Sequence, residues 1–206
     1  MLKLRHTASA LLTVVALAGC VSVTPDQTPP RKIAGSFDEL LDHRLSLPDL
    51  NDFEREVYQR AKESGRISQA DHDEAYSRLS ACMTESGKPI TLRKLKNGLY
   101  RITSTPLDPN ESTEHAIAII SSCEDSTTGF IPELFQIQQV NPELIGDSFE
   151  VTYRCLERAG LVPDGYSLER FKKAQLEPPP PGKRSTDDLP FDLNSEDFQA
   201  CEIGKM

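Results

Sequence analysis

The sequence of 206 residues contains no tryptophan, and phenylalanine and tyrosine together supply only 6 % of it. A core built from this composition is aliphatic and modest, so we expect it to need covalent support. Three catalytic signatures are also missing: the Gly-x-Ser-x-Gly nucleophile elbow, the His-Glu-x-x-His helix and the phosphate-binding glycine loop. The sequence therefore indicates none of the enzyme classes that these motifs mark.

Positive charge is in short supply as well. The 23 Lys and Arg residues stand against 32 Asp and Glu, which leaves a formal net charge of −9 at pH 7. An acidic surface is repelled by nucleic acid and gains nothing from anionic lipid headgroups. We therefore expect no nucleic-acid partner, and attachment to a membrane would have to come from a lipid.

No apolar run approaches the ~20 residues that a membrane-spanning helix needs. The N-terminal run at residues 8–17 contains two polar residues, Ser9 and Thr13, and Lys3 and Arg5 precede it. Small residues and a cysteine follow the run. This layout predicts a cleaved export signal.

The end of that signal, Leu17-Ala18-Gly19-Cys20, resembles the lipobox of bacterial lipoproteins. The resemblance implies cleavage before Cys20 and a diacylglyceryl group, with acyl chains such as palmitate, on the Cys20 thiol. Two or more acyl chains give stable membrane anchoring. The alternative is an ordinary secretory signal that happens to contain a cysteine.

The predicted organisation has three parts. Residues 1–19 form the lipoprotein signal peptide, residues 20–35 a lipid-anchored flexible tether, and residues 36–206 a mostly helical domain braced by disulfides. A proline-rich linker at residues 177–190 interrupts the domain. The tether is predicted from its prolines and polar residues, which show no apolar period.

Four cysteines remain after Cys20, and an even number in an exported chain predicts two disulfides. Four cysteines allow three pairings, and the sequence alone does not choose among them. We favour Cys82 with Cys123 and Cys155 with Cys201, because each pair joins neighbouring segments. No two cysteines have the two-to-four-residue separation typical of zinc ligands, so we expect no metal site.

Apolar residues at three- and four-residue steps, with capping residues at the ends, predict a mainly α fold. Asn97-Gly98, between two alternating stretches, predicts one β-hairpin over residues 89–104, with Lys94 and Lys96 solvated. The predicted helices cover residues 36–41, 53–64, 68–86, 111–124, 132–140, 149–159, 167–171 and 195–202.

An internal echo links two of these helices. Residues 82–87 and 155–160 share the order cysteine, apolar, two polar, small, glycine. This pattern indicates two similar helix ends. The alternative is that any helix ending at a glycine cap shows the same order of residues. The segments from Tyr76 to Gly87 and from Tyr153 to Gly160 resemble uncharacterised exported proteins of high-GC Gram-positive bacteria. That resemblance implies disulfides and no particular activity.

The candidates for chemistry all have a simpler structural interpretation. Asp71, His72 and Asp73 would point about 100° apart on a helix, so they cannot converge on one ligand. His115 and His43 have no evident partners. Residues 108–111 offer oxygen ligands without the spacing of an EF-hand. The proline run at residues 178–181 could dock in an aromatic groove, but it serves equally as a spacer.

The sequence therefore predicts a disulfide-braced, mainly α domain with one small β-hairpin, held outside the cytoplasmic membrane by lipid on Cys20. We expect a non-enzymatic cell-envelope lipoprotein, without cofactor, that binds an envelope protein or a cell-wall component. The alternative is an envelope enzyme with a site assembled from distant residues. A cleft that joins His72 or His115 to carboxylates would favour that alternative.

Overall fold

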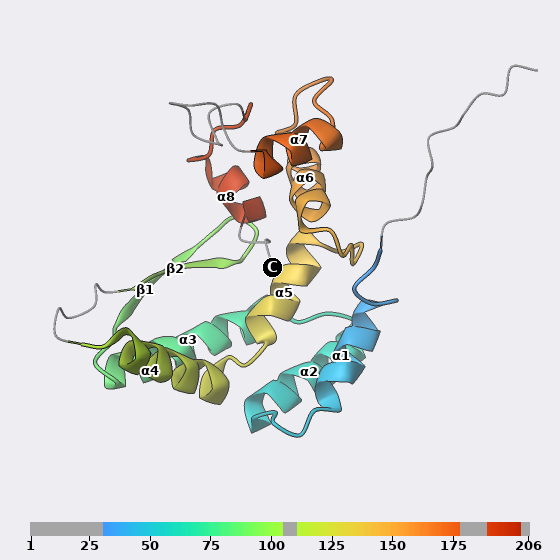
Figure 1. The fold of residues 1–206 in the computed structure, drawn as a ribbon. Coiled ribbons are helices and arrows are strands. Elements are labelled where there is room, and N and C mark those ends of the chain that lie inside the picture. The colour runs from blue at the N-terminus through green and yellow to red at the C-terminus, as the bar shows by residue number, and fades with distance from the viewer. Residues whose placement is uncertain (1–30, 105–110, 178–188, 203–206) are drawn as a thin grey trace, which may run out of the picture.

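A computed structural model of the chain describes residues 31–104, 111–177 and 189–202. These ranges hold eight helices and one two-stranded antiparallel hairpin, which confirms the predicted fold class (Figure 1). The predicted signal peptide, Cys20, the tether up to residue 30, residues 108–110 and the prolines at 178–181 lie outside the described residues. Within the described ranges, no helix has the length and apolar character needed to cross a membrane.

The helices lie close to where the sequence predicts them. Two of them, α1 and α7, run four and five residues longer than predicted. The elements are α1 (Phe37–Leu45), α2 (Asp52–Ser64), α3 (Gln69–Glu85), β1 (Ile90–Lys94), β2 (Tyr100–Ser104), α4 (Thr113–Thr127), α5 (Ile131–Val140), α6 (Ser148–Arg158), α7 (Leu168–Leu176) and α8 (Glu196–Glu202).

Helix starts depend on local capping. The Ser36, Ser68 and Ser167 side chains are N-caps, and each accepts a hydrogen bond from the backbone N–H three residues on. Asn51 does the same for α2 and forms a full capping box with Glu54. The caps satisfy backbone donors that the helix itself leaves unpaired.

The two predicted helix ends have the same geometry. Gly87 and Gly160 both adopt a left-handed φ, 73° and 70° respectively. Past each glycine, a backbone N–H bonds back to the last turn: Lys88 N–H donates to Met83 O, and Leu161 N–H to Leu156 O. This Schellman arrangement needs a residue that tolerates positive φ. The repeated sequence pattern therefore corresponds to a repeated backbone motif.

The hairpin pairs Leu92 with Ile102 and Lys94 with Tyr100. Its loop contains three residues and not the two that Asn97-Gly98 most often forms. Gly98 N–H donates to Leu95 O (2.9 Å) and Leu95 N–H donates to Leu99 O (2.8 Å), while Gly98 has φ 83°. These are the features of a turn followed by a left-handed glycine bulge. Leu95 and Leu99 are buried, so the loop itself packs into the protein.

Three apolar clusters hold the elements together. The central cluster joins α1, α2, α3 and α5 with the hairpin loop. A second cluster lies between the base of the hairpin, α3 and α4. The third joins α6, α7 and α8. In Figure 1 the hairpin runs from the α3–α4 pair to α8, and its residues belong to the second and the central clusters.

Each peripheral cluster contains one disulfide. Cys82 bonds to Cys123 and Cys155 bonds to Cys201, with Cα atoms 5.7 and 5.6 Å apart. The structure therefore confirms the pairing that the sequence favoured among three. The Cys155–Cys201 disulfide links α8 covalently to α6. The predicted proline-rich linker lies between these two helices in the sequence.

The N-terminal end of the described chain is part of the fold. Lys32 forms an isolated bridge with Ile145, and Ile33 N–H donates to Leu144 O at 2.9 Å. Residues 31–35, which the sequence places in the tether, thus pair with the α5–α6 connection. The folded part extends to Arg31.

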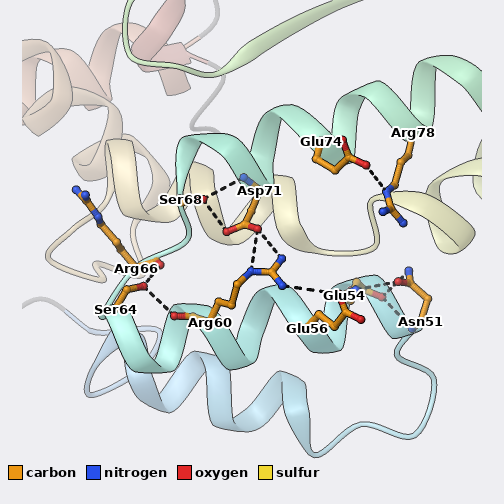
Figure 2. Close-up of polar contacts among 10 residues, drawn as sticks. All are labelled: Asn51, Glu54, Glu56, Arg60, Ser64, Arg66, Ser68, Asp71, Glu74 and Arg78. Carbon is orange, nitrogen blue, oxygen red and sulfur yellow. Dashed lines mark hydrogen bonds and ion pairs between the residues drawn. The ribbon is translucent and has the colours of Figure 1, made fainter.

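A polar seam joins α2 to the start of α3 (Figure 2). Arg60 of α2 donates to Asp71 Oδ1 from Nε (3.2 Å) and from Nη2 (2.6 Å). The other carboxylate oxygen of Asp71 accepts from the Ser68 hydroxyl at 2.6 Å. The cap of α3 is therefore tied to α2 as well as to its own helix.

Candidate functional site

A cleft of about 610 Å³ lies where three separate segments meet. Its lining residues are 66–69 at the start of α3, 94–98 in the hairpin loop, and Phe135, Gln138 and Gln139 of α5. The volume falls in the range of small-molecule sites, ~300–1,000 Å³. We call this feature the basic cleft, because Arg66, Lys94 and Lys96 line it and no carboxylate of the described residues does.

The hairpin beside the basic cleft carries only positive charge, and two of its cations, Lys94 and Lys96, line the cleft. The hairpin supplies Arg93, Lys94, Lys96 and Arg101, and no acidic residue, over residues 90–104. The chain as a whole is at −9. Clefts lined by charge of one sign focus the local potential and attract ligands of the opposite sign.

Asp73 fixes the position of the hairpin against α3. Its carboxylate accepts from Lys94 Nζ at 2.7 Å, from Gln69 Nε2 at 2.8 Å and from the Tyr100 hydroxyl at 3.0 Å. Gln69 also donates to Gly98 O at 3.0 Å. Lys94 is exposed, as predicted, and its ammonium group is also paired with the Asp73 carboxylate.

These contacts set the charge state of Asp73. Burial would raise the pKa of its carboxyl, but the hydrogen bonds from Lys94, Gln69 and Tyr100 outweigh burial and hold the pKa below its usual value. The same hydrogen bond to Asp73 raises the pKa of Lys94. The pair is therefore ionised at neutral pH, and Lys94 is already matched by a carboxylate.

Lys96 docks the hairpin loop on α8. Its backbone N–H donates to Glu196 Oε1 at 3.1 Å, and its ammonium lies 3.3 Å from Asp197 Oδ1. Asn97 Nδ2 donates to Ala200 O at 3.3 Å. One wall of the basic cleft is thus held by α8, which the Cys155–Cys201 disulfide in turn links to α6.

The floor of the basic cleft is apolar. Ile67, Leu95 and Phe135 are each at most 3 % exposed and belong to the central cluster. Gln138 supports the floor, since its side chain accepts from Ile67 N–H at 2.9 Å and donates to Ile67 O at 3.1 Å. A ligand in this cleft would meet a rigid apolar base and a polar rim.

His72 lies behind this floor and not in the cleft. The ring is fully buried, and neither nitrogen has a hydrogen-bond partner among the described residues. Burial lowers the pKa of His72 to about 4, with a further lowering by Lys94 and a partial offset by Asp73. The imidazole is therefore neutral at physiological pH and has no access to a ligand.

The other residues considered for chemistry do not converge. Asp71 turns to Arg60, His72 enters the core and Asp73 turns to the hairpin, as expected for neighbours on one helix. His43 and His115 are exposed on α1 and α4. Within residues 31–104, 111–177 and 189–202, no three His, Cys, Asp or Glu side chains are placed to hold one metal ion.

A second charged cluster, around Glu54, is structural. The Glu54 carboxylate is 3 % exposed and accepts from the Tyr58 hydroxyl and from Phe130 N–H, both at 2.9 Å. It also accepts from Asn51, and Arg44 lies 3.8 Å away. Both carboxylate oxygens have donors, so this group ties α2 to the α4–α5 turn and leaves nothing free for a ligand.

Sequence reasoning did not single out Arg66, and it assigned Lys96 to solvent. The available signal was the run of four cations without a carboxylate in the hairpin of an acidic chain. No local sequence pattern indicates that residues 66–69, 94–98 and 135–139 lie together in the fold. A comparison of the chain with protein-family models, with curated proteins and with solved structures found no match.

Proposed function

We propose that the protein is a lipoprotein of the bacterial cell envelope, anchored by lipid on Cys20, whose folded part binds a ligand in the basic cleft without transforming it. The observation that carries the binding role is the cleft itself. It is a 610 Å³ hollow with an apolar floor and a cationic rim in a chain of net charge −9. Clefts of this volume that combine apolar surface with convergent polar groups are typical of ligand sites.

The proposed location has separate support. The lipobox-like Leu17-Ala18-Gly19-Cys20 supports lipid attachment, and two disulfides support an oxidising compartment outside the cytoplasm. Arg31 marks the start of the described fold, so the residues after Cys20 would serve as the tether. The partner would then be an envelope protein or a cell-wall component.

A non-enzymatic role fits the lining of the basic cleft. The groups that would move protons, His72 and His115, do not line it, and neither does any carboxylate in the part of the chain that the structure describes. The lining side chains are cations, amides, a hydroxyl and apolar groups, which bind and orient ligands.

Two measurements test the proposal. Mass spectrometry of the protein from the membrane fraction should find a diacylglyceryl group on Cys20, and Cys20→Ser should release the protein while the neighbouring Ser22→Ala should not. Protein-observed NMR of the mature lipoprotein in nonionic detergent, with a library of charged and uncharged fragments, should shift the Gln69 and Gly98 amides. An unmodified Cys20 would overturn the anchor. Fragments that bind only elsewhere would overturn the binding site.

A further inference from the structure

We propose that the basic cleft selects small organic anions, in which a phosphate or carboxylate group is joined to an apolar body. This inference rests on the proposed binding function and adds the chemical class of the ligand. It follows from three features of the cleft: one cation without a partner among the described residues, one weakly paired cation, and a buried apolar floor.

The unpartnered cation is Arg66. Its guanidinium makes no hydrogen bond or ion pair with any described residue, and in Figure 2 it extends away from the Arg60–Asp71 contacts. A guanidinium is always charged at neutral pH, and its planar fork matches the two oxygens of a carboxylate or phosphate. Arg66 is therefore available to an incoming anion at no loss of an existing contact.

Lys96 is the weakly paired cation. Its ammonium lies 3.3 Å from Asp197, and the two side chains are 65 % and 46 % exposed. Exposed pairs of this kind are weak, so a ligand can compete for the lysine. Lys94 is different, because Asp73 accepts from it with both oxygens and already balances its charge.

The apolar floor limits which anions fit well. Ile67, Leu95 and Phe135 present buried hydrocarbon at the base of the cleft, below the cations. Only the edges of these side chains reach the cleft, and an apolar ring or chain would cover those edges, whereas a bare inorganic ion would not. An organic anion can contact the cations and the apolar residues of the cleft at the same time, whereas a simple anion can contact only the cations.

The hairpin wall is preorganised for this ligand. Gln69 bonds to Gly98 O, and Asn97 bonds to Ala200 O, so the loop is held on both sides. A wall that is already ordered loses less conformational entropy on binding. The cations at the rim therefore project from a fixed frame.

The test uses four small probes, each titrated calorimetrically into the mature lipoprotein in nonionic detergent. Phenyl phosphate has both the anion and the ring, inorganic phosphate has only the anion, phenol has only the ring, and benzylamine has the ring with a cation. We expect phenyl phosphate to bind tightest, benzylamine weakest, and the affinity for phenyl phosphate to fall as salt is raised.

Arg66→Gln is the decisive variant, and Arg101→Gln is its control. Both remove one exposed cation without a partner among the described residues, but Arg101 lies on the hairpin outside the cleft. Arg66→Gln should weaken phenyl phosphate by roughly 10- to 100-fold, the range for a hydrogen bond to a charged group. Arg101→Gln should leave the affinity within about twofold, because its charge is screened at physiological salt.

The possible failures are distinguishable. If phenol or benzylamine bound as tightly as phenyl phosphate and shifted the cleft amides, the ligand class would be wrong and the binding function would stand. If phenyl phosphate bound but Arg66→Gln did not weaken it, the inferred site would be overturned. If no probe bound, the anion proposal would fail, and the fragment measurement above would decide the binding function separately.

Discussion

The imidazole ring of His72 stacks on the phenyl ring of Phe135, with 4.0 Å between centroids and 17° between planes. Tyr76 meets the same imidazole edge-on at 5.0 Å. Phe135 is also part of the floor of the basic cleft. The packing of a buried histidine therefore supports the surface that would receive a ligand, and its protonation state matters for stability.

The free energy of unfolding should fall as the pH drops from about 6.5 to about 4. Burial lowers the pKa of His72 to about 4, whereas an unfolded histidine titrates near 6.5. Between these values the unfolded chain binds a proton that the folded chain does not, so each pH unit lowers stability by up to ~1.4 kcal/mol. Above pH 6.5 this contribution is complete. Urea unfolding at pH 7, 5.5 and 4.5 measures it.

Two variants isolate the effect. His72→Phe keeps an aromatic ring in the stack. Between pH 6.5 and about 4 it should reduce the number of protons that the chain takes up on unfolding by up to one, and so flatten the pH dependence of the free energy of unfolding. His115→Gln, which removes an exposed histidine of α4, is the matched control. A wild-type slope retained in His72→Phe would assign the pH dependence to other groups.

The elements could be predicted because their signals are local. Ser68 caps a backbone N–H only three residues away, and Gly87 and Gly160 end their helices by adopting φ values that other residues avoid. Order along the chain favoured the observed cysteine pairing without excluding the other two, since each bond closes one segment on the next. The caps and the helix ends depend on residues that are close together in the sequence, so a local pattern is enough to predict them.

The basic cleft could not be predicted in this way. Arg66 and Lys96 have no local signature, and their meeting depends on how the hairpin loop packs. Leu95 and Leu99, on either side of the three-residue loop, are buried. Their burial places Lys96 and Gly98 beside the start of α3 and beside α5, where they line the cleft. Tertiary packing of this kind has no period along the sequence.

Gly129→Ala should destabilise the protein by more than a strained glycine alone would explain. Gly129 has φ 49°, and a Cβ there would lie 1.8 Å from the Glu54 Cδ. The substitution would displace the carboxylate from its donors, which costs about 1.5–3 kcal/mol, in addition to about 1–2 kcal/mol of left-handed strain. Chemical denaturation gives the total.

Gly160→Ala is the matched control for that clash. Gly160 has φ 70°, but a Cβ added there would have no other atom within 4 Å among the described residues. It should therefore show the strain alone. In a Glu54→Ala background the cost of Gly129→Ala should shrink to the same value. Equal effects of Gly129→Ala in both backgrounds would mean that the carboxylate moves aside freely.

Arg60 should couple measurably to Asp71 and hardly at all to Glu56. The Asp71 carboxylate is 15 % exposed and lies 2.6 Å from Arg60 Nη2, whereas Glu56 is 68 % exposed and 3.7 Å away (Figure 2). Double-mutant cycles with alanine should give about 0.5–1 kcal/mol for the first pair and close to zero for the second. Raising the salt concentration should reduce the first value. Equal couplings would show that the shorter contact adds nothing to the α2–α3 seam.

Removing the Cys155–Cys201 disulfide should loosen the wall of the basic cleft, and removing Cys82–Cys123 should not. The two bonds span 46 and 41 residues, so the chain-entropy model assigns each about 4 kcal/mol. Their local effects differ, because only Cys201 belongs to α8, where Glu196 accepts the Lys96 N–H. Serine double variants of each pair therefore separate global stability from the position of the hairpin loop.

Amide hydrogen exchange reads out that difference. The Lys96 N–H depends on α8, whereas the Leu95 N–H bonds to Leu99 O within the hairpin. Cys155→Ser with Cys201→Ser should speed exchange at Lys96 relative to Leu95 and weaken phenyl phosphate binding. Cys82→Ser with Cys123→Ser should change both amides in parallel. The same Lys96-to-Leu95 ratio in both variants would mean that α8 stays docked through Phe198 and Ala200, which are buried, without its covalent link to α6.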